Sequence, residues 1–133
     1  MNSTANSKTI AIAVVLEADR YLVGKRPEGV ALAGFWEFPG GKVEAHDGSP
    51  AVAACRECLE ETGLAIAIQS ELAHVRHEYA HGTLELHFFL AHPLDASTEP
   101  HGAFRWVSRE ELLRLDFPPA NQTVLEQIRA ARY

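Results

Sequence analysis

The stretch from residue 49 to residue 63 (SPAVAACRECLEETG) constrains the fold of this chain more than any other part of its sequence. Ser49 is a favourable helix N-cap, Pro50 suits the first helical position, and Gly63 is the residue type that most often follows a helix end. These signals predict a helix that ends at about Thr62. Such a helix has to bury one face against another element.

Three glutamates cluster on one side of this helix. At about 100° per residue, Glu57, Glu60 and Glu61 fall within an arc of roughly 100°. The opposite side is apolar and is expected to be the buried one, through Val52, Cys55, Cys58 and Leu59. A solvated acidic face is the simplest interpretation, but Glu57 and Glu61 repel each other, and the helix dipole disfavours anions near this end. A Mg²⁺ ion held by these hard oxygen ligands would remove both penalties.

The composition narrows the class of protein. The 133 residues suit one domain, expected over residues 1–133 with residues 1–8 as a frayed end. A formal net charge of −6 argues against binding of nucleic acid polymers, and no apolar run approaches the roughly 20 residues that span a membrane. The polar start lacks the features of a signal peptide, so a cytoplasmic location is expected.

Cysteine and histidine give little indication of a metal or redox centre. Cys55 and Cys58 have no second pair to complete a zinc site and are expected to be small core residues. The seven histidines lack ligand spacing, and most are expected at surface or strand positions.

The rest of the chain mixes strands and helices without a regular β-α-β order. Strands are expected over residues 9–18, 20–25, 83–91 and 104–107, with a short apolar piece at 35–38 and one or two strands within 65–79. Pro39, Gly40 and Gly41 are expected to stop the piece at 35–38. Further helices are expected from the cap Ser108 to residue 115 and over residues 121–132. This order predicts an α/β fold, a central sheet with helices on both faces.

Residues 40–64 resemble the Nudix box, whose pattern is G-x5-E-x7-R-E-U-x-E-E-x-G-U with U a bulky apolar residue. Residues 56–64 (RECLEETGL) match its second half. Between Gly41 and Arg56 this chain is one residue longer than the pattern, and either Asp47 or Gly48 replaces the first Glu. The resemblance implies an α/β/α sandwich around a mixed sheet and hydrolysis of a nucleoside diphosphate linked to another group.

Other segments resemble the MutT branch of that family: Arg26, residues 37–41 (EFPGG), residues 104–107 (FRWV) and residues 116–121 (DFPPAN). The resemblance implies hydrolysis of a nucleoside triphosphate to a monophosphate and pyrophosphate. The expected substrate is 8-oxo-dGTP, so the expected role is sanitation of the nucleotide pool in support of DNA repair. Substrate contacts are expected from Arg26, Glu37, Phe38, Pro39, Gly40 and Asn121.

The same resemblance implies roles for the charged residues. Mg²⁺, or else Mn²⁺, is expected to bind Gly40 (through its carbonyl), Glu57, Glu60, Glu61 and Glu99. Glu57 or Glu60 is expected to deprotonate a water molecule. Arg56 is expected to orient a carboxylate by a bidentate contact. His101 is an alternative to Glu99 as the group that completes the site.

Asn121 is the residue expected to select the base. The 8-oxo form of guanine presents an acceptor and a donor side by side, and an Asn amide matches both. The alternative is that Asn121 only caps the last helix.

Several alternatives to this function stay open. Other Nudix substrates would be another deoxynucleotide, ADP-ribose or a dinucleoside polyphosphate, and a different class would be a domain that senses nucleotides without hydrolysis. The expected partner is a small nucleotide, and the expected assembly is a monomer or small homo-oligomer.

Overall fold

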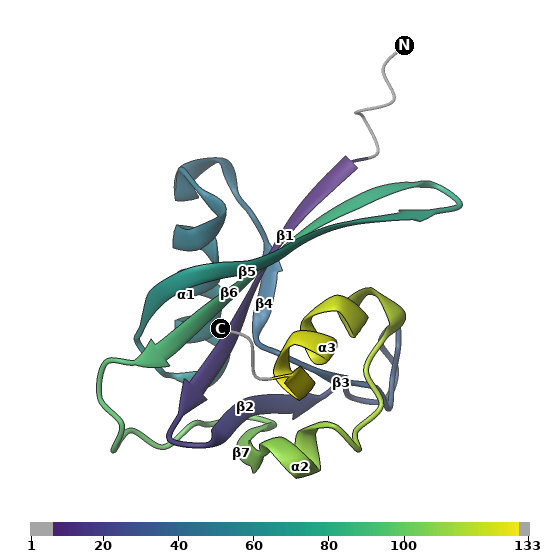
Figure 1. Cartoon of the computed structure of the whole chain (residues 1–133). Helices are drawn as coiled ribbons and strands as arrows, with labels where there is room; N and C mark the ends of the chain where they lie inside the picture. Colours follow the sequence, from purple (N-terminus) through teal and green to yellow (C-terminus); the bar gives the residue numbers. More distant parts are fainter. Residues whose placement is uncertain (1–6, 131–133) are drawn as a thin grey trace.

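A mixed sheet forms the centre of the molecule in the computed structural model, which describes residues 7–130 (Figure 1). Its strands are β1 (Ser7–Glu17), β2 (Arg20–Lys25), β3 (Trp36–Glu37), β4 (Gly40–Lys42), β5 (Ile66–Tyr79), β6 (Gly82–Pro93) and β7 (Phe104–Ser108). Strand β1 pairs in parallel with β6, and every other pairing is antiparallel. The order is β3-β2-β1-β6-β5, with β4 beside β1 and β7 beside β2.

Helices cover both faces of this sheet. They are α1 (Pro50–Thr62), α2 (Arg109–Leu112) and α3 (Gln122–Ala130), with 3-10 turns η2 (Ala45–Asp47) and η3 (Pro119–Asn121). Alternate residues of β1 point to opposite faces, as they must in a strand. Val14 packs in the core that contains α3, and Ala13 packs in the core that contains α1. The predicted α/β sandwich is therefore confirmed.

The ends of α1 lie where the sequence places them. The Ser49 hydroxyl accepts a hydrogen bond from the Val52 N–H at 3.2 Å, and Gly63 adopts a left-handed φ of 80° while its N–H donates to the Leu59 carbonyl. Ser108 caps α2 in the same way, through the Glu111 N–H at 3.0 Å. None of the described helices has both the length and the apolar character needed to span a membrane.

Two expectations about strands need correction. Strand β1 begins at Ser7, so residues 7 and 8 are not a frayed end; they pair with β6 at Thr83 and Leu84. Residues 1–6 of the expected frayed end, and the last residues of the expected C-terminal helix, lie outside the described residues. The Gly-Gly sequence does not stop a strand but begins β4. Gly40 permits this because a Cβ there would lie 2.5 Å from the Ala11 carbonyl oxygen across the strand pair.

Candidate active site

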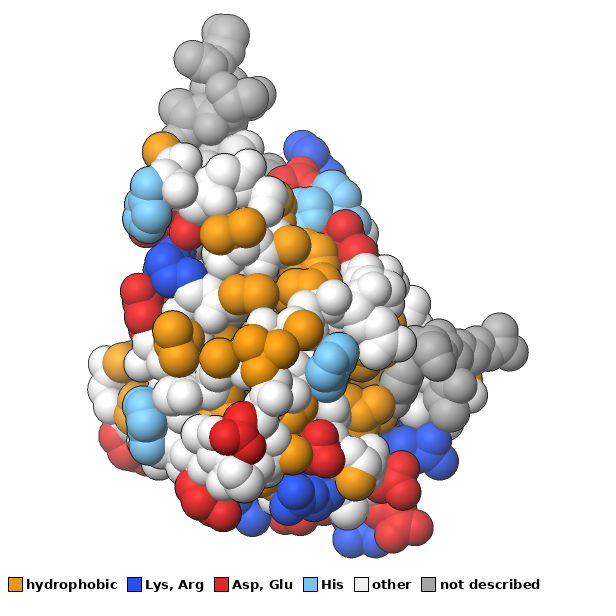
Figure 2. Space-filling model, turned by 90° about the vertical axis from the view of Figure 1, so that its left-hand side faces the viewer, with side chains coloured by type: hydrophobic (Ala, Val, Ile, Leu, Met, Phe, Trp, Pro, Cys, Tyr) orange, Lys and Arg blue, Asp and Glu red, His pale blue; other side chains and the backbone are white. Residues whose placement is uncertain are grey.

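Helix α1 turns two of its glutamates toward the sheet and leaves large apolar residues in solvent. Its fully buried positions are small or polar: Ala53, Ala54, Cys58 and Thr62. Val52 and Leu59 are each 51% exposed, and hydrophobic side chains gather on this side of the molecule in Figure 2. The expectation that Val52 and Leu59 are buried is therefore wrong. The helix packs closely through its alanines, and this close contact brings the neighbouring glutamates against β4.

Cys58 is fully buried, as expected, and Cys55 is half-buried with its thiol near the Ile66 carbonyl. Burial raises the pKa of the Cys58 thiol to about 11. Both cysteines are free, and a thiol with this pKa is unreactive at neutral pH.

Glu57 lies in a space that only a glycine leaves open. A Cβ atom built at Gly41 in β4 would overlap the Glu57 carboxylate group. The Glu57 side chain is only 16% exposed as a result of this packing. The glycine at position 41 thus gives a carboxylate on α1 direct access to the backbone of β4.

Glu61 is the most perturbed of the three glutamates. Its Oε1 accepts a hydrogen bond from the Gly40 N–H at 3.1 Å. Burial is the main cause that raises the pKa of Glu61 to about 7, and the charges of Glu57, Glu37 and Glu60 add to the rise against the opposing effect of the Gly40 hydrogen bond. A carboxylate surrounded by other carboxylates favours a cation at this position.

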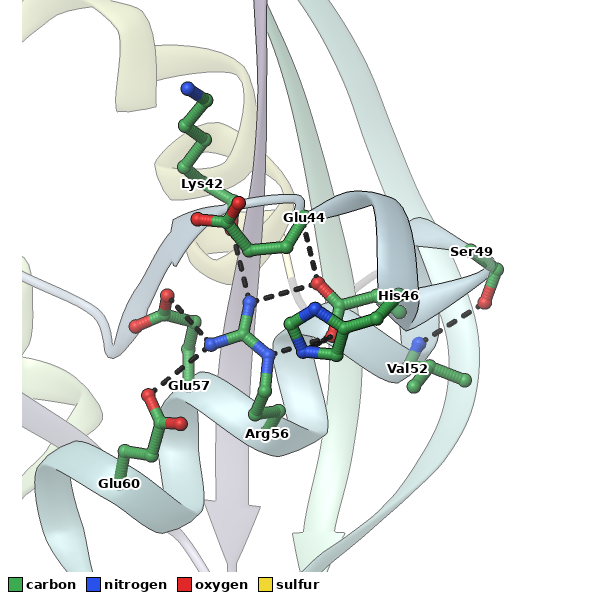
Figure 3. Close-up of polar contacts among 9 residues, drawn as sticks. Lys42, Glu44, His46, Ser49, Val52, Arg56, Glu57 and Glu60 are labelled. Carbon is green, nitrogen blue, oxygen red and sulfur yellow. Dashed lines mark hydrogen bonds and ion pairs between the residues drawn. The ribbon is translucent and has the colours of Figure 1, made fainter.

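Arg56 makes a bidentate ion pair with Asp47 (Figure 3). Its Nε lies 2.7 Å from Asp47 Oδ1 and its Nη2 lies 2.8 Å from Oδ2. This contact holds the pKa of the Asp47 carboxyl well below its usual range. Asp47 belongs to the turn η2 and also accepts from the Glu44 N–H, so the residue that stands where the pattern has its first Glu joins the turn to α1.

The remaining donor of Arg56 reaches the glutamates. Its Nη1 lies 3.2 Å from Glu57 Oε2 and 3.2 Å from Glu60 Oε1, as Figure 3 shows. Because these oxygens contact Arg56 and Glu61 contacts Gly40, no three acidic, His or Cys side chains between residues 7 and 130 are already arranged around a metal position. The donor set nevertheless fits Mg²⁺ in its chemistry: it consists of hard carboxylate oxygens.

The structure brings one of the two later candidates to this helix. His101 donates its backbone N–H to the Thr62 carbonyl at 3.0 Å, and a Cβ at Gly63 would lie 2.6 Å from its ring. His101 therefore lies against the C-terminal end of α1. Glu99 is exposed, and the described residues show no contact between it and the three glutamates.

A cavity of about 540 Å³ lies on the other side of β4. Its walls include most of the residues that the sequence predicts to contact substrate: Arg26, Glu37, Phe38, Gly40 and Asn121. Pro39 is fully buried and is not part of the wall. Gly40 and Gly41 line the cavity and also contact Glu61 and Glu57, so β4 separates the cavity from the glutamates by a single backbone.

Two of these polar residues already have protein partners. Arg26 Nη1 lies 2.8 Å from Glu37 Oε1, and Arg26 Nε donates to the Ala31 carbonyl at 2.7 Å. The Asn121 amide nitrogen donates to the Pro118 carbonyl at 3.2 Å. Asn121 lies in η3, and its side chain is a donor in this contact, whereas an N-cap side chain accepts from the backbone.

Sequence reasoning missed part of the cavity wall. Trp36, His77, Tyr79 and Leu32 also line it. His77 and Tyr79 alternate along β5, and this period of two is visible in the sequence. The sequence does not show which face of β5 meets the cavity, because that depends on pairing with β6.

Comparison with known proteins places the chain in a family. The sequence profile of the NUDIX domain matches residues 11–127. The CTP pyrophosphohydrolase of Escherichia coli (strain K12) is 33% identical over 124 residues, which cover 91% of each chain. The putative 8-oxo-dGTP diphosphatase 2 of Mycobacterium tuberculosis is 33% identical over 119 residues, covering 87% of this chain and 84% of that one.

Solved structures agree with this assignment. A MutT structure from work on Aliivibrio salmonicida and Vibrio cholerae superposes with a TM-score of 0.73 at 30% identity, covering 94% of this chain and 98% of that chain. With the fold, the box residues on α1 and these similarities together, the chain belongs to the Nudix family and is a MutT-like pyrophosphohydrolase.

Proposed function

We propose that this enzyme hydrolyses 8-oxo-dGTP to 8-oxo-dGMP and pyrophosphate with the help of Mg²⁺, or Mn²⁺ in its place. The observation that supports this most is the shared strand β4. Gly40 and Gly41 line the cavity on one side and contact Glu61 and Glu57 on the other. A nucleoside in the cavity would extend its phosphates past these two glycines to the carboxylates of α1.

The proposed metal ligands are Glu57, Glu60, Glu61 and the Gly40 carbonyl. When bound there, Mg²⁺ would neutralise phosphate charge and make a bound water more acidic. Glu57 or Glu60 would accept the proton of the attacking water, while the bond between phosphorus and the leaving pyrophosphate breaks. Arg56, fixed by Asp47, would orient these two glutamates through its third nitrogen. His101 lies close enough to the end of α1 to be preferred over Glu99 as the further group.

In the cavity, Arg26 and Glu37 would act as a pair. Arg26 uses Nε and Nη1 for the Ala31 carbonyl and Glu37, which leaves Nη2 for the nucleotide. Glu37 keeps one oxygen for a sugar or base donor. Phe38, which stacks on Phe117 at 4.9 Å between ring centroids, would supply an apolar surface beside them.

Asn121 would distinguish the oxidised base from the normal one. Its amide nitrogen spends one N–H on Pro118 and keeps a second, and its carbonyl oxygen has no recorded partner among the described residues. These two groups match the O6 acceptor and the N7–H donor of 8-oxoguanine, whereas normal guanine presents an acceptor at both positions. The mismatch would leave buried polar groups unpaired.

The test is the ratio of kcat/KM for 8-oxo-dGTP and dGTP. We expect the wild type to prefer 8-oxo-dGTP, and Asn121→Ala to remove most of this preference while hydrolysis of dGTP stays within about tenfold. Gln122→Ala, at an exposed neighbouring position, is the control. An unchanged ratio in Asn121→Ala together with a lower Tm would mean that Asn121 is only structural.

CTP is the second candidate substrate. A relative with 33% identity over 91% of both chains is a CTP pyrophosphohydrolase. Carboxylate and amide oxygens accept from the amino group of cytosine, and both Glu37 and Asn121 bring such oxygens to the cavity. Product analysis with 8-oxo-dGTP, dGTP and CTP, with and without Mg²⁺, separates the two candidates. Faster release of pyrophosphate from CTP than from 8-oxo-dGTP would contradict the first proposal.

A further inference from the structure

One histidine on the wall of the cavity is set apart from the other histidines of its hairpin. His77 lies on β5 opposite Leu84 of β6, is half-buried and lines the cavity. Its face of the strand is shared with Val75, which packs against the core, and with Tyr79, which is 40% exposed and also lines the cavity. The side chains on this face thus pass from apolar to polar along the strand.

The histidines on the opposite face of the hairpin have partners. His74 Nε2 lies 2.6 Å from Glu85 Oε1, and His87 Nδ1 lies 2.7 Å from Glu71 Oε2. The two rings also stack on each other with centroids 4.1 Å apart. Within residues 7–130, His77 has no hydrogen bond or ion pair of this kind, although it is less exposed than His74.

The surroundings of His77 define the kind of ligand that would pair with it. The nearby wall is apolar and includes Ile10, Leu84 and Leu86. A polar group against such a wall loses hydration and gains little from the protein, so a ligand that hydrogen-bonds it recovers this loss. A neutral imidazole offers one donor and one acceptor, which suits the edge of a nucleobase.

The charges of the cavity support a base rather than a phosphate as this partner. Arg26 and Glu37, the charged residues in its wall, neutralise each other through their 2.8 Å contact. The phosphates would lie beyond β4, next to the carboxylates of α1 and their metal. His77 lies on the hairpin, away from that strand.

We propose that His77 hydrogen-bonds the nucleobase in this cavity and is a specificity-determining residue of the enzyme. This rests on the proposed binding of a nucleotide there. Asn121 reads the base from η3, and His77 reads it from β5, so two elements that are remote in sequence share the choice of base. Neither residue takes part in the breaking of the phosphate bond.

The experiment compares His77→Leu, His77→Gln and His74→Leu with the wild type. The Kd values of 8-oxo-dGMP, dGMP and CMP are measured by calorimetry, and KM and kcat are measured for the three triphosphates. Leucine suits the apolar wall, so His77→Leu should fold, and its Tm is checked. His74→Leu removes a histidine from the same strand but from the other face.

We expect His77→Leu to raise the Kd of the preferred monophosphate about tenfold, or about 1.4 kcal/mol. The loss should differ between the three bases, and kcat should stay within about threefold. His77→Gln, which keeps a donor and an acceptor, should stay close to the wild type, and His74→Leu should be unchanged. These four results together support the proposal.

Three results would overturn it. Wild-type affinity in His77→Leu would exclude the contact, and an equal loss for all three bases would place the contact on the sugar or phosphate. An equal loss in His74→Leu would show a general effect of the hairpin. If the wild type binds none of the monophosphates and hydrolyses none of the triphosphates, the proposed function itself fails, and the variants distinguish this from failure of His77 alone.

Discussion

The two longer helices pack on opposite faces of the same sheet but use their side chains in opposite ways. Helix α3 buries Val124, Leu125 and Ile128 and exposes its charged residues. Helix α1 turns Glu57 and Glu61 toward β4 and exposes Val52 and Leu59. A helix whose only task is to cover a sheet has no reason to bury carboxylates.

The difference separates stability from function within one fold. The apolar face of α3 contributes through burial of surface, at about 25 cal/mol per Å². The acidic face of α1 lowers stability in the absence of a cation, because it brings carboxylates together in a partly buried place. Functional sites are where a protein departs from the pattern that would stabilise it most.

The largest expected effect tests the acidic face of α1. Glu57→Gln should lower kcat/KM about a thousandfold, or about 4 kcal/mol, because it removes a proposed metal ligand. The Tm of the metal-free variant should not fall, since one of the repelling charges is gone. Steady-state kinetics and thermal unfolding measure the two quantities. Glu126→Gln, at an exposed position of α3, is the control; a loss of activity there, or near wild-type activity in Glu57→Gln, would contradict the contrast.

The reverse pattern is expected for α3. Ile128 is fully buried, and Ile128→Ala should reduce the free energy of unfolding by about 2–5 kcal/mol through lost burial and a residual cavity. The kcat of the folded fraction should be unchanged, because α3 carries none of the proposed catalytic residues. Denaturant unfolding measures the first quantity, and assays well below the Tm measure the second. A lower kcat with normal stability would mean that α3 also serves the reaction.

The two glycines of β4 allow a finer test. Gly41→Ala should lower activity about tenfold or more with little change in Tm, because the new Cβ displaces the flexible Glu57 side chain. Gly40→Ala should instead destabilise the protein by about 1–3 kcal/mol, because its Cβ meets the Ala11 carbonyl and the Ile12 Cα of the neighbouring strand. Activity and unfolding measured for both variants would refute this separation if the two lost the same property.

The smallest expected effect is on the exposed side of α1. Leu59→Lys should change the free energy of unfolding by less than about 0.5 kcal/mol, because half of the side chain already lies in solvent and the C-terminal half of a helix favours a cation. The matched change in α3, Leu125→Lys, should unfold the protein at a much lower denaturant concentration. If Leu59→Lys is equally damaging, the exposed side of α1 has a contact that the isolated chain does not show.

Local signals account for what could be predicted of α1. Its ends follow from Ser49 and Gly63, which act on the backbone next to them. Its orientation could not be predicted from hydrophobicity, because the close packing of Ala53 and Ala54 against the sheet outweighs the burial of Val52 and Leu59. Large apolar side chains would have kept the helix too far from β4 for Glu57 to reach it.

Long-range pairing explains the rest of the differences. Strand β4 escaped prediction because its three residues are held by β1, at Ile10 to Ile12, and not by any propensity of their own. The sequence left open whether Asp47 or Gly48 stands in for the first Glu of the box, and only the turn η2 shows that Asp47 is the one that contacts Arg56. The cavity joins residues from Ile10 to Asn121, so its membership depends on the whole sheet.

The parallel pairing of β1 with β6 has a consequence for the way the chain folds. Ser7 pairs with Thr83 and Val15 pairs with Ala91, so the first strand has to wait for residues near the middle and end of the chain. On the ribosome, the hairpin of β1 and β2 can form early, but one side of β1 stays open until β6 has emerged. Contacts this distant in sequence make folding slow. A long apolar strand left unpaired in that interval is a site for aggregation, so synthesis rate and chaperone supply should decide the yield of active protein more strongly than final stability does.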